Sequence, residues 1–197
     1  MNFSNRELRD LLVAWLALGL AFSLLSVRVS VTTIGDVLAS APFLEEFALS
    51  LATVGVAFLL HELAHKVVAV RFGQHAEFRA DFGMLALAVA GGLAGFLFAA
   101  PGAVHHRGRI TPREHGLIAL AGPLTNVALA VVSLGLLLTV APDAGWRALY
   151  INVLLSGFNM IPFGPLDGAT VLQWSKPVYA VAAVITIGPA LVFFLGI

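Results

Sequence analysis

Six stretches of this sequence are apolar over about the length that a helix needs to cross a bilayer. A helix that spans ~30 Å of hydrocarbon needs roughly 20 residues. The apolar stretches occur at residues 11–27, 47–70, 82–104, 116–141, 148–172 and 178–197. Because the loops between them are short, the sequence predicts an all-α polytopic membrane protein of five to six transmembrane helices, with residues 1–197 forming a single domain.

The composition agrees with a membrane protein. Hydrophobic residues make up 59% of the chain and charged residues 11%, whereas soluble domains carry about a quarter charged residues. The formal net charge is zero, which argues against a nucleic-acid partner and leaves the lipid bilayer as the expected environment. The run at 11–27 is too long for a signal-peptide core, so we interpret it as a retained membrane anchor.

The distribution of Lys and Arg predicts five crossings of the cell membrane with a cytoplasmic N-terminus. Basic residues collect on the cytoplasmic side. If all six stretches cross, the 11 basic residues split six against five; if 82–104 enters and returns on one side, they split nine against two. Gly91, Gly92 and Gly95 also weaken a continuous helix there. We therefore expect a re-entrant segment or short strands between the second and third core elements, with an ordinary helix containing packing glycines as the alternative.

An H-E-x-x-H motif, His61 to His65, lies inside the apolar stretch 47–70. Histidines four residues apart lie on one face of a helix, where two imidazoles can share a zinc ion and the adjacent Glu62 can act on water. An ionisable group at the centre of a transmembrane helix costs on the order of 2.5–3.5 kcal/mol and usually marks function. The alternative is a polar helix end that leaves the bilayer, because Lys66 follows the motif.

Two histidines need a third protein ligand, and the chain has no cysteine to supply it. The candidates by residue type are Asp81, His105, His106, Glu114, His115, Asp143 and Asp167. Asp167 differs from the others because it lies in "FNMIPFGPLDGATVL", residues 158–172, with apolar sequence on both sides. Pro162, Pro165 and the neighbouring glycines should unwind the helix there, so that an aspartate can turn towards an ion. A turn aspartate at the membrane interface is the alternative.

Two asparagines in the apolar stretches are further candidates. Asn126 ends the sequence "AGPLTN", and Asn159 precedes Pro162. Either amide could donate a hydrogen bond to a developing oxyanion. Each also has a structural explanation, as an interhelical contact or as an amide that satisfies backbone groups in a broken helix.

Together these residues resemble the site-2 protease family of intramembrane zinc metalloproteases. The similarity comprises H-E-x-x-H at His61–His65, G-P-x-x-N at Gly122–Asn126 and N-x-x-P-x-x-x-L-D-G at Asn159–Gly168. The three motifs come in the order found in the family, and the similarity covers about 47–172.

The resemblance implies one zinc ion per chain, bound by His61, His65 and Asp167, with Glu62 as the catalytic base. It implies that the two ligand-bearing helices are parallel, with an antiparallel helix between them. It also implies an integral-membrane metalloprotease that cuts transmembrane helices of other membrane proteins in regulated intramembrane proteolysis. We expect a minimal form of the family, without a PDZ or CBS domain.

A transmembrane transporter of zinc or another divalent metal is the alternative function, since some zinc carriers place H-E-x-x-H within a transmembrane helix. A carrier needs further ligands on a neighbouring helix, where residues 117–140 offer Thr125 and Asn126. A catalytically inactive structural relative is a third hypothesis. Among the three, the sequence favours the protease.

Overall fold

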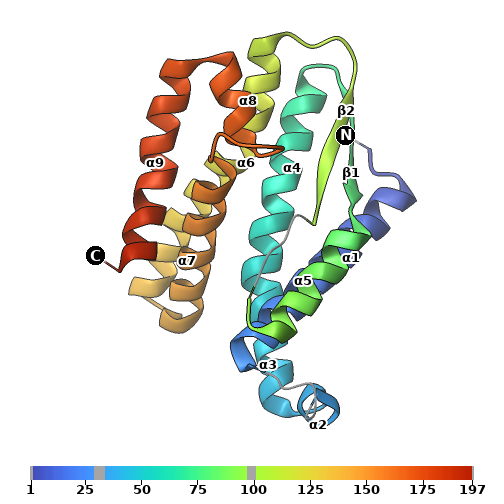
Figure 1. The fold of residues 1–197 in the computed structure, drawn as a ribbon, viewed down its shortest axis with the longest axis vertical. Coiled ribbons are helices and arrows are strands. Elements are labelled where there is room, and N and C mark those ends of the chain that lie inside the picture. The colour runs from blue at the N-terminus through green and yellow to red at the C-terminus, as the bar shows by residue number, and fades with distance from the viewer. Residues whose placement is uncertain (1, 29–33, 97–100, 197) are drawn as a thin grey trace. The chain divides into compact units, whose positions relative to one another are not determined.

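The structure, a computed structural model, describes residues 2–28, 34–96 and 101–196 and is mostly helical (Figure 1). The helices are α1 (Asn5–Val27), α2 (Ile34–Leu38), α3 (Ala41–Ser50), the π-helical η1 (Leu51–Gly55), α4 (Val56–Arg71), α5 (Phe82–Ala94), α6 (Pro112–Leu138), α7 (Pro142–Asn159), α8 (Asp167–Trp174) and α9 (Lys176–Leu195). The strands β1 (His75–Ala80) and β2 (Gly102–Arg107) form a two-stranded sheet.

The chain divides into two compact units. The α1 unit comprises residues 2–59 and 77–105, and the α6 unit comprises residues 60–76 and 106–196. The division passes through α4, β1 and β2, so each unit is described by itself.

Four helices within the described residues are long and apolar enough to cross a membrane. They are α1, the continuous helix Ala41–Arg71 formed by α3, η1 and α4, then α6 and α9. These helices indicate a membrane protein, as the sequence predicts. The predicted stretch 148–172 is two helices rather than one, because α7 ends at Asn159 and α8 begins at Asp167. The total of five to six crossings stays a prediction.

The stretch 82–104 is not a continuous helix. Its helical part, α5, has 13 residues and is therefore about 20 Å long, shorter than the hydrocarbon layer. The backbone N–H of Asp81 donates to the Pro101 carbonyl at 3.0 Å, so the two ends of the stretch lie side by side. A segment whose ends meet does not carry the chain across a bilayer, which supports the re-entrant prediction. Residues 97–100 of this stretch lie outside the described residues.

Two buried carboxylates of α1 bind one edge of β1. Glu7 Oε1 accepts from the Phe78 N–H at 3.0 Å, and Asp10 Oδ2 accepts from the Ala80 N–H at 3.4 Å. Alternate N–H groups of a strand point to the same edge, and the Asp81 N–H points towards β2 through its bond to Pro101. The α1 carboxylates therefore satisfy the edge of β1 that faces away from β2.

Close backbone contacts and an apolar cluster hold the rest of the α1 unit together. A Cβ at Gly92 of α5 would lie 2.3 Å from the Ala21 carbonyl oxygen of α1, so a glycine is required where these helices touch. The cluster consists of Leu11, Ala14, Leu18, Phe58, Phe78 and Leu85.

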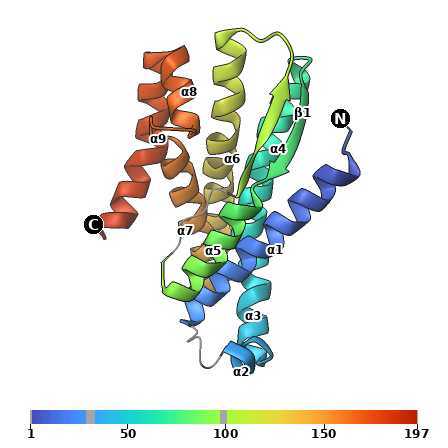
Figure 2. The ribbon, with the colours of Figure 1, turned by 45° about the vertical axis from the view of Figure 1, so that its right-hand side comes forward.

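In the α6 unit, α6 runs antiparallel to both α4 and α7, and α8 continues in the direction of α7 (Figures 1 and 2). Helix α6 begins with a capping box, in which the Thr111 hydroxyl accepts from the Glu114 N–H and the Glu114 carboxylate accepts from the Thr111 N–H. The core of the unit joins α6, α8, α9 and the residue that follows α7 through Ala119, Val171, Ala182 and Met160. This arrangement agrees with the parallel ligand-bearing helices that the resemblance implies.

Candidate metal centre

Three predicted ligands meet in the α6 unit. The Nε2 atoms of His61 and His65 lie 3.0 Å apart, and they lie 3.3 and 3.5 Å from Asp167 Oδ2. Donor atoms around a tetrahedral zinc ion with bonds of 2.0–2.1 Å lie roughly 3.3 Å from one another. The three separations therefore fit a zinc ion, and the two imidazoles and the carboxylate are a donor set that zinc accepts. In the part of the chain that the structure describes, the ligand atoms of His61, His65 and Asp167 lie close enough to one another to hold one metal ion.

The opposite ring nitrogens of both histidines are held by protein oxygens. His61 Nδ1 lies 2.6 Å from Asn126 Oδ1, and His65 Nδ1 lies 2.7 Å from the Ile118 carbonyl oxygen. A metal-binding histidine commonly donates its second N–H in this way, which orients the ring. Both Nε2 atoms are left to face the metal position.

Asn126 is itself held by a residue that the sequence does not single out. The Asn126 Nδ2 group donates to Asn152 Oδ1 of α7 at 2.9 Å. Asn152 lies seven residues before Asn159 in the apolar stretch 148–172, so the two amides fall on one helix face two turns apart. A polar side chain within an apolar, membrane-length stretch is the sequence signal that could have identified Asn152.

Gly122 of α6 leaves the space beside the ligand atoms open. A Cβ at this position would lie 2.4 Å from His65 Nε2 and 2.6 Å from His61 Nε2. A methyl group there would fill the side of the site onto which both nitrogens open. The glycine of "AGPLTN" therefore has a role in the shape of the metal site, in addition to the close helix approach expected from the sequence.

The predicted break in the helix delivers Asp167 to the site. Between α7 and α8, Gly164 adopts φ 59° in the left-handed region, where glycine is favoured. A Cβ at Gly168 would lie 2.2 Å from the Met160 carbonyl oxygen, so the start of α8 packs directly on the end of the preceding segment. The unwinding predicted from the prolines and glycines is confirmed.

Glu62 follows His61 on α4 and is buried, with 8% of its surface exposed. His65 and His61 lie six and ten residues before Arg71, which ends α4, or about 9 and 15 Å along the helix axis. The motif is therefore well inside the long apolar helix Ala41–Arg71 and not at its end. The alternative of a polar helix end that leaves the bilayer stays a prediction.

Five of the other predicted residues have local contacts. Asn159 Nδ2 donates to the Leu155 carbonyl of its own helix at 3.0 Å. Of the other candidate ligands, Asp81 caps α5 through the Met84 N–H at 3.0 Å, and Glu114 belongs to the capping box of α6. His106 and His115 pack edge to face, with ring centroids 5.3 Å apart.

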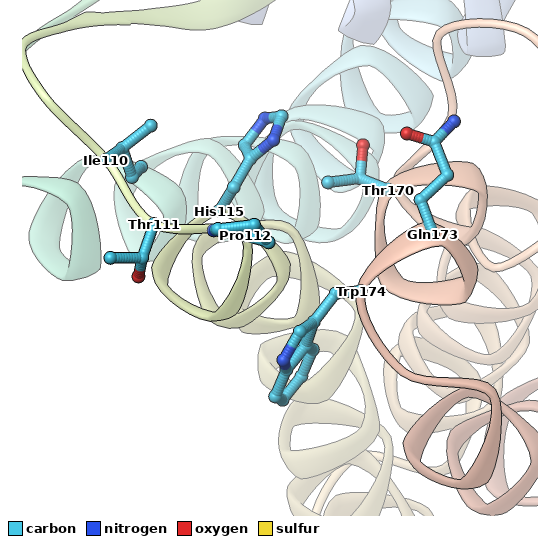
Figure 3. Close-up of a pocket in the computed structure, with 7 residues that line it drawn as sticks. All are labelled: Ile110, Thr111, Pro112, His115, Thr170, Gln173 and Trp174. Carbon is cyan, nitrogen blue, oxygen red and sulfur yellow. The ribbon is translucent and has the colours of Figure 1, made fainter.

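A polar pocket of about 390 Å³ opens between the start of α6 and the end of α8 (Figure 3). It is lined by Ile110, Thr111, Pro112, His115, Thr170, Gln173 and Trp174. His115 is one helical turn from Ile118, and Thr170 is one turn from Asp167. The Asp167 side chain is also the most exposed of the three ligands, at 18% against 5% and 10% for His61 and His65. The metal centre therefore has its most accessible ligand on the helix that lines the pocket.

Comparisons with known proteins agree with this centre. No family model and no solved structure matches the chain. The chain is 40% identical over 194 residues to "Putative zinc metalloprotease MJ0611" of Methanocaldococcus jannaschii, which covers 95% of this chain and 94% of that protein. It is 30% identical over 148 residues to "Putative zinc metalloprotease YwhC" of Bacillus subtilis, which covers 61% of this chain and 66% of that protein. It is 33% identical over 123 residues to "Putative zinc metalloprotease Rip3" of Mycobacterium tuberculosis, which covers 58% of this chain and 28% of that protein.

The names of these relatives and the geometry of His61, His65 and Asp167 agree on zinc as the cofactor. The 40% identity to the Methanocaldococcus jannaschii relative extends over nearly the full length of both proteins, so the similarity is not confined to a shared motif. The chain therefore belongs to the zinc metalloprotease family of these relatives, a site-2 protease-like family.

Proposed function

We propose that this protein is an intramembrane zinc endopeptidase that hydrolyses peptide bonds in transmembrane helices of other membrane proteins. The observation that carries the proposal is the group His61, His65 and Asp167, in which both histidines and the adjacent Glu62 lie on a helix apolar and long enough to cross a membrane. A hydrolytic metal site at that depth suits a substrate that lies in the same layer.

Distances along two helices indicate how deep the site lies in the membrane. The two histidines lie about 9 and 15 Å from the basic end of α4 at Arg71, measured with a rise of 1.5 Å per residue. Ile118, which binds His65, lies six residues into α6, again about 9 Å from the helix end. If each helix is centred on ~30 Å of hydrocarbon, its ends project by about 5–8 Å, so both measures support a site close to one surface of the hydrocarbon layer.

The chemistry follows from the residues at the site. His61, His65 and Asp167 would hold the zinc ion, which when bound supplies Lewis-acid activation of water and of the scissile carbonyl. Glu62 takes a proton from the attacking water at its carboxylate and delivers it to the leaving nitrogen, as general base and then general acid. The buried environment of Glu62 excludes other water from this proton transfer.

Water has to reach Glu62, and the pocket at the start of α6 supports a route. Thr170 on the pocket wall lies one helical turn from Asp167, and the wall carries hydroxyl, imidazole and amide groups. We assign this end of the α6 unit to the cytoplasmic side, with the N-terminus also cytoplasmic in a cell-membrane protein, on the basis of the Lys and Arg distribution.

The roles of the two asparagines differ in this proposal. Asn126 uses its oxygen for His61 and an N–H for Asn152, which favours a ligand-positioning role over oxyanion binding. Asn159 is engaged by one N–H with Leu155. Asn159 is partly exposed, whereas Asn126 is fully buried, and this accessibility keeps Asn159 as the candidate donor to the developing oxyanion.

The test uses purified protein in proteoliposomes with a single-span membrane protein as substrate. Wild-type protein should cut the substrate within or near its transmembrane helix. Glu62→Gln should bind zinc at the wild-type ratio and cut nothing, because the amide cannot accept the proton. Glu45→Gln, at an exposed site on α3, is the matched control and should retain activity. Full activity in Glu62→Gln would refute the proposed base.

The same vesicles distinguish the transporter hypothesis. A carrier would move zinc into vesicles and leave the substrate intact. A protease would cut the substrate without zinc uptake above that of empty vesicles.

A further inference from the structure

We propose that Asn152 of α7 is a positioning residue of the metal centre, which acts through Asn126 to hold His61 in the tautomer that binds zinc. The proposal rests on the metal centre of the proposed function and not on its peptidase step. Asn126 and Asn152 are 0% and 3% exposed. Buried amide groups of this kind need protein partners, so their hydrogen bonds can be followed from one group to the next.

The direction of these hydrogen bonds is set by a backbone carbonyl. Asn152 Nδ2 lies 2.8 Å from the Ala148 carbonyl oxygen. A carbonyl can only accept, so Asn152 must turn its NH₂ group towards Ala148 and its oxygen towards Asn126. Asn126 must then donate to that oxygen, at 2.9 Å, and turn its own oxygen towards His61.

The same logic fixes the proton on His61. Asn126 Oδ1 lies 2.6 Å from His61 Nδ1 and can only accept, so Nδ1 carries the hydrogen. A neutral imidazole has one N–H, so His61 Nε2 presents its lone pair on the side of His65 and Asp167. Without Asn152, the side-chain amide of Asn126 can flip by 180° and present its NH₂ group to His61 Nδ1. The ring hydrogen would then sit on Nε2 and oppose metal binding.

The second histidine does not need such a relay. His65 Nδ1 lies 2.7 Å from the Ile118 carbonyl, which cannot turn over as a side-chain amide can. The two ligands of α4 are therefore held in different ways, one by a carbonyl directly and one through two amides. Of the two histidines, only His61 is oriented by side chains, so only its orientation can be altered by substituting a residue remote from the metal.

Two variants of Asn152 separate a directional role from a space-filling one. Asn152→Leu keeps the approximate volume and removes the acceptor for Asn126. It should weaken zinc binding by about 10–100-fold, the usual effect of losing an outer-shell partner. Asn152→Asp still accepts from Asn126, whether ionised or protonated with its proton on the Ala148 side, so it should stay within about threefold of wild type. A space-filling role predicts the opposite order, since leucine needs no partner and aspartate buries a polar acid.

The measurement is zinc affinity of the full chain in detergent, by competition with a chelating indicator. The visible spectrum of the Co²⁺-loaded protein should change in Asn152→Leu and be unchanged in Asn152→Asp, and the thermal unfolding midpoint reports whether each variant folds. Adding Asn126→Asp to Asn152→Leu should restore at least tenfold in affinity, because a carboxylate accepts from His61 without a relay.

Loss of affinity in Asn152→Asp with retention in Asn152→Leu would overturn the proposal. If Asn152→Leu fails to fold, a fall of more than tenfold in Asn152→Asp alone also overturns it, and retention supports it. None of these readouts uses peptide cleavage, so a wrong substrate assignment leaves the result unaffected.

Discussion

Gly122→Ala places a methyl group directly against the two histidine nitrogens of the metal centre. The added Cβ would lie 2.4 Å from His65 Nε2 and 2.6 Å from His61 Nε2, whereas ordinary contacts begin at 3.4 Å. The two ligand nitrogens would therefore have to retreat by about 1.0 and 0.8 Å. Their rings cannot move freely, because Ile118 and Asn126 hold the opposite nitrogens.

The expected loss of zinc affinity follows from these displacements. A zinc–nitrogen bond of 2.0–2.1 Å that is stretched by about 1 Å no longer coordinates. Losing a group that only orients one ligand costs about 10–100-fold in affinity. Displacing two ligands should therefore cost more than about 100-fold, or about 2.7 kcal/mol.

The assay compares Gly122→Ala with Gly135→Ala on the same helix, where the added Cβ meets nothing within 4 Å. Zinc per purified chain is measured by elemental analysis and affinity by chelator competition. Unfolding midpoints recorded in excess chelator separate metal loss from general destabilisation. If Gly122→Ala binds zinc within threefold of Gly135→Ala, the assigned geometry of the metal site is wrong.

Three further outcomes are expected. Glu7→Ala leaves the buried Phe78 N–H without its acceptor and should destabilise the protein by about 1–3 kcal/mol; an unchanged thermal midpoint in detergent would contradict this. Gly168→Ala puts a Cβ 2.2 Å from the Met160 carbonyl, so it should shift Asp167 and lower the zinc content, and wild-type content would show that α8 can adjust. Chelator treatment should abolish peptidase activity and one equivalent of zinc should restore it, whereas activity that survives metal removal would exclude zinc hydrolysis.

The local parts of the site were predictable because they depend on helix periodicity and backbone chemistry. The spacing of His61 and His65 places both rings on one helix face whatever the helix packs against. Prolines and glycines around Asp167 break the helix for reasons contained in their own covalent structure. Apolar stretches of about 20 residues likewise predict membrane helices without knowledge of their neighbours.

The remaining groups at the site depend on which helix faces meet, and a single sequence does not specify that. Asn152 acts on His61 through Asn126, across 26 and 65 residues of chain. The Ile118 carbonyl is a backbone group, so no residue type marks it. Gly122 could be read as a packing glycine in general, but its place beside two ligand nitrogens depends on the register of α6 against α4.

The path of the stretch 82–104 shows the same division. Its glycines and the distribution of Lys and Arg predicted a break and a return to the same side, because both are properties of the chain itself. The hydrogen bond from Asp81 to Pro101 and the α1 carboxylates on β1 required residues about 20 and 70 positions apart to meet. The sequence thus predicted which residues could hold the metal ion, and tertiary packing decided which groups hold those residues in position, because such contacts arise only when separate helices are brought into register.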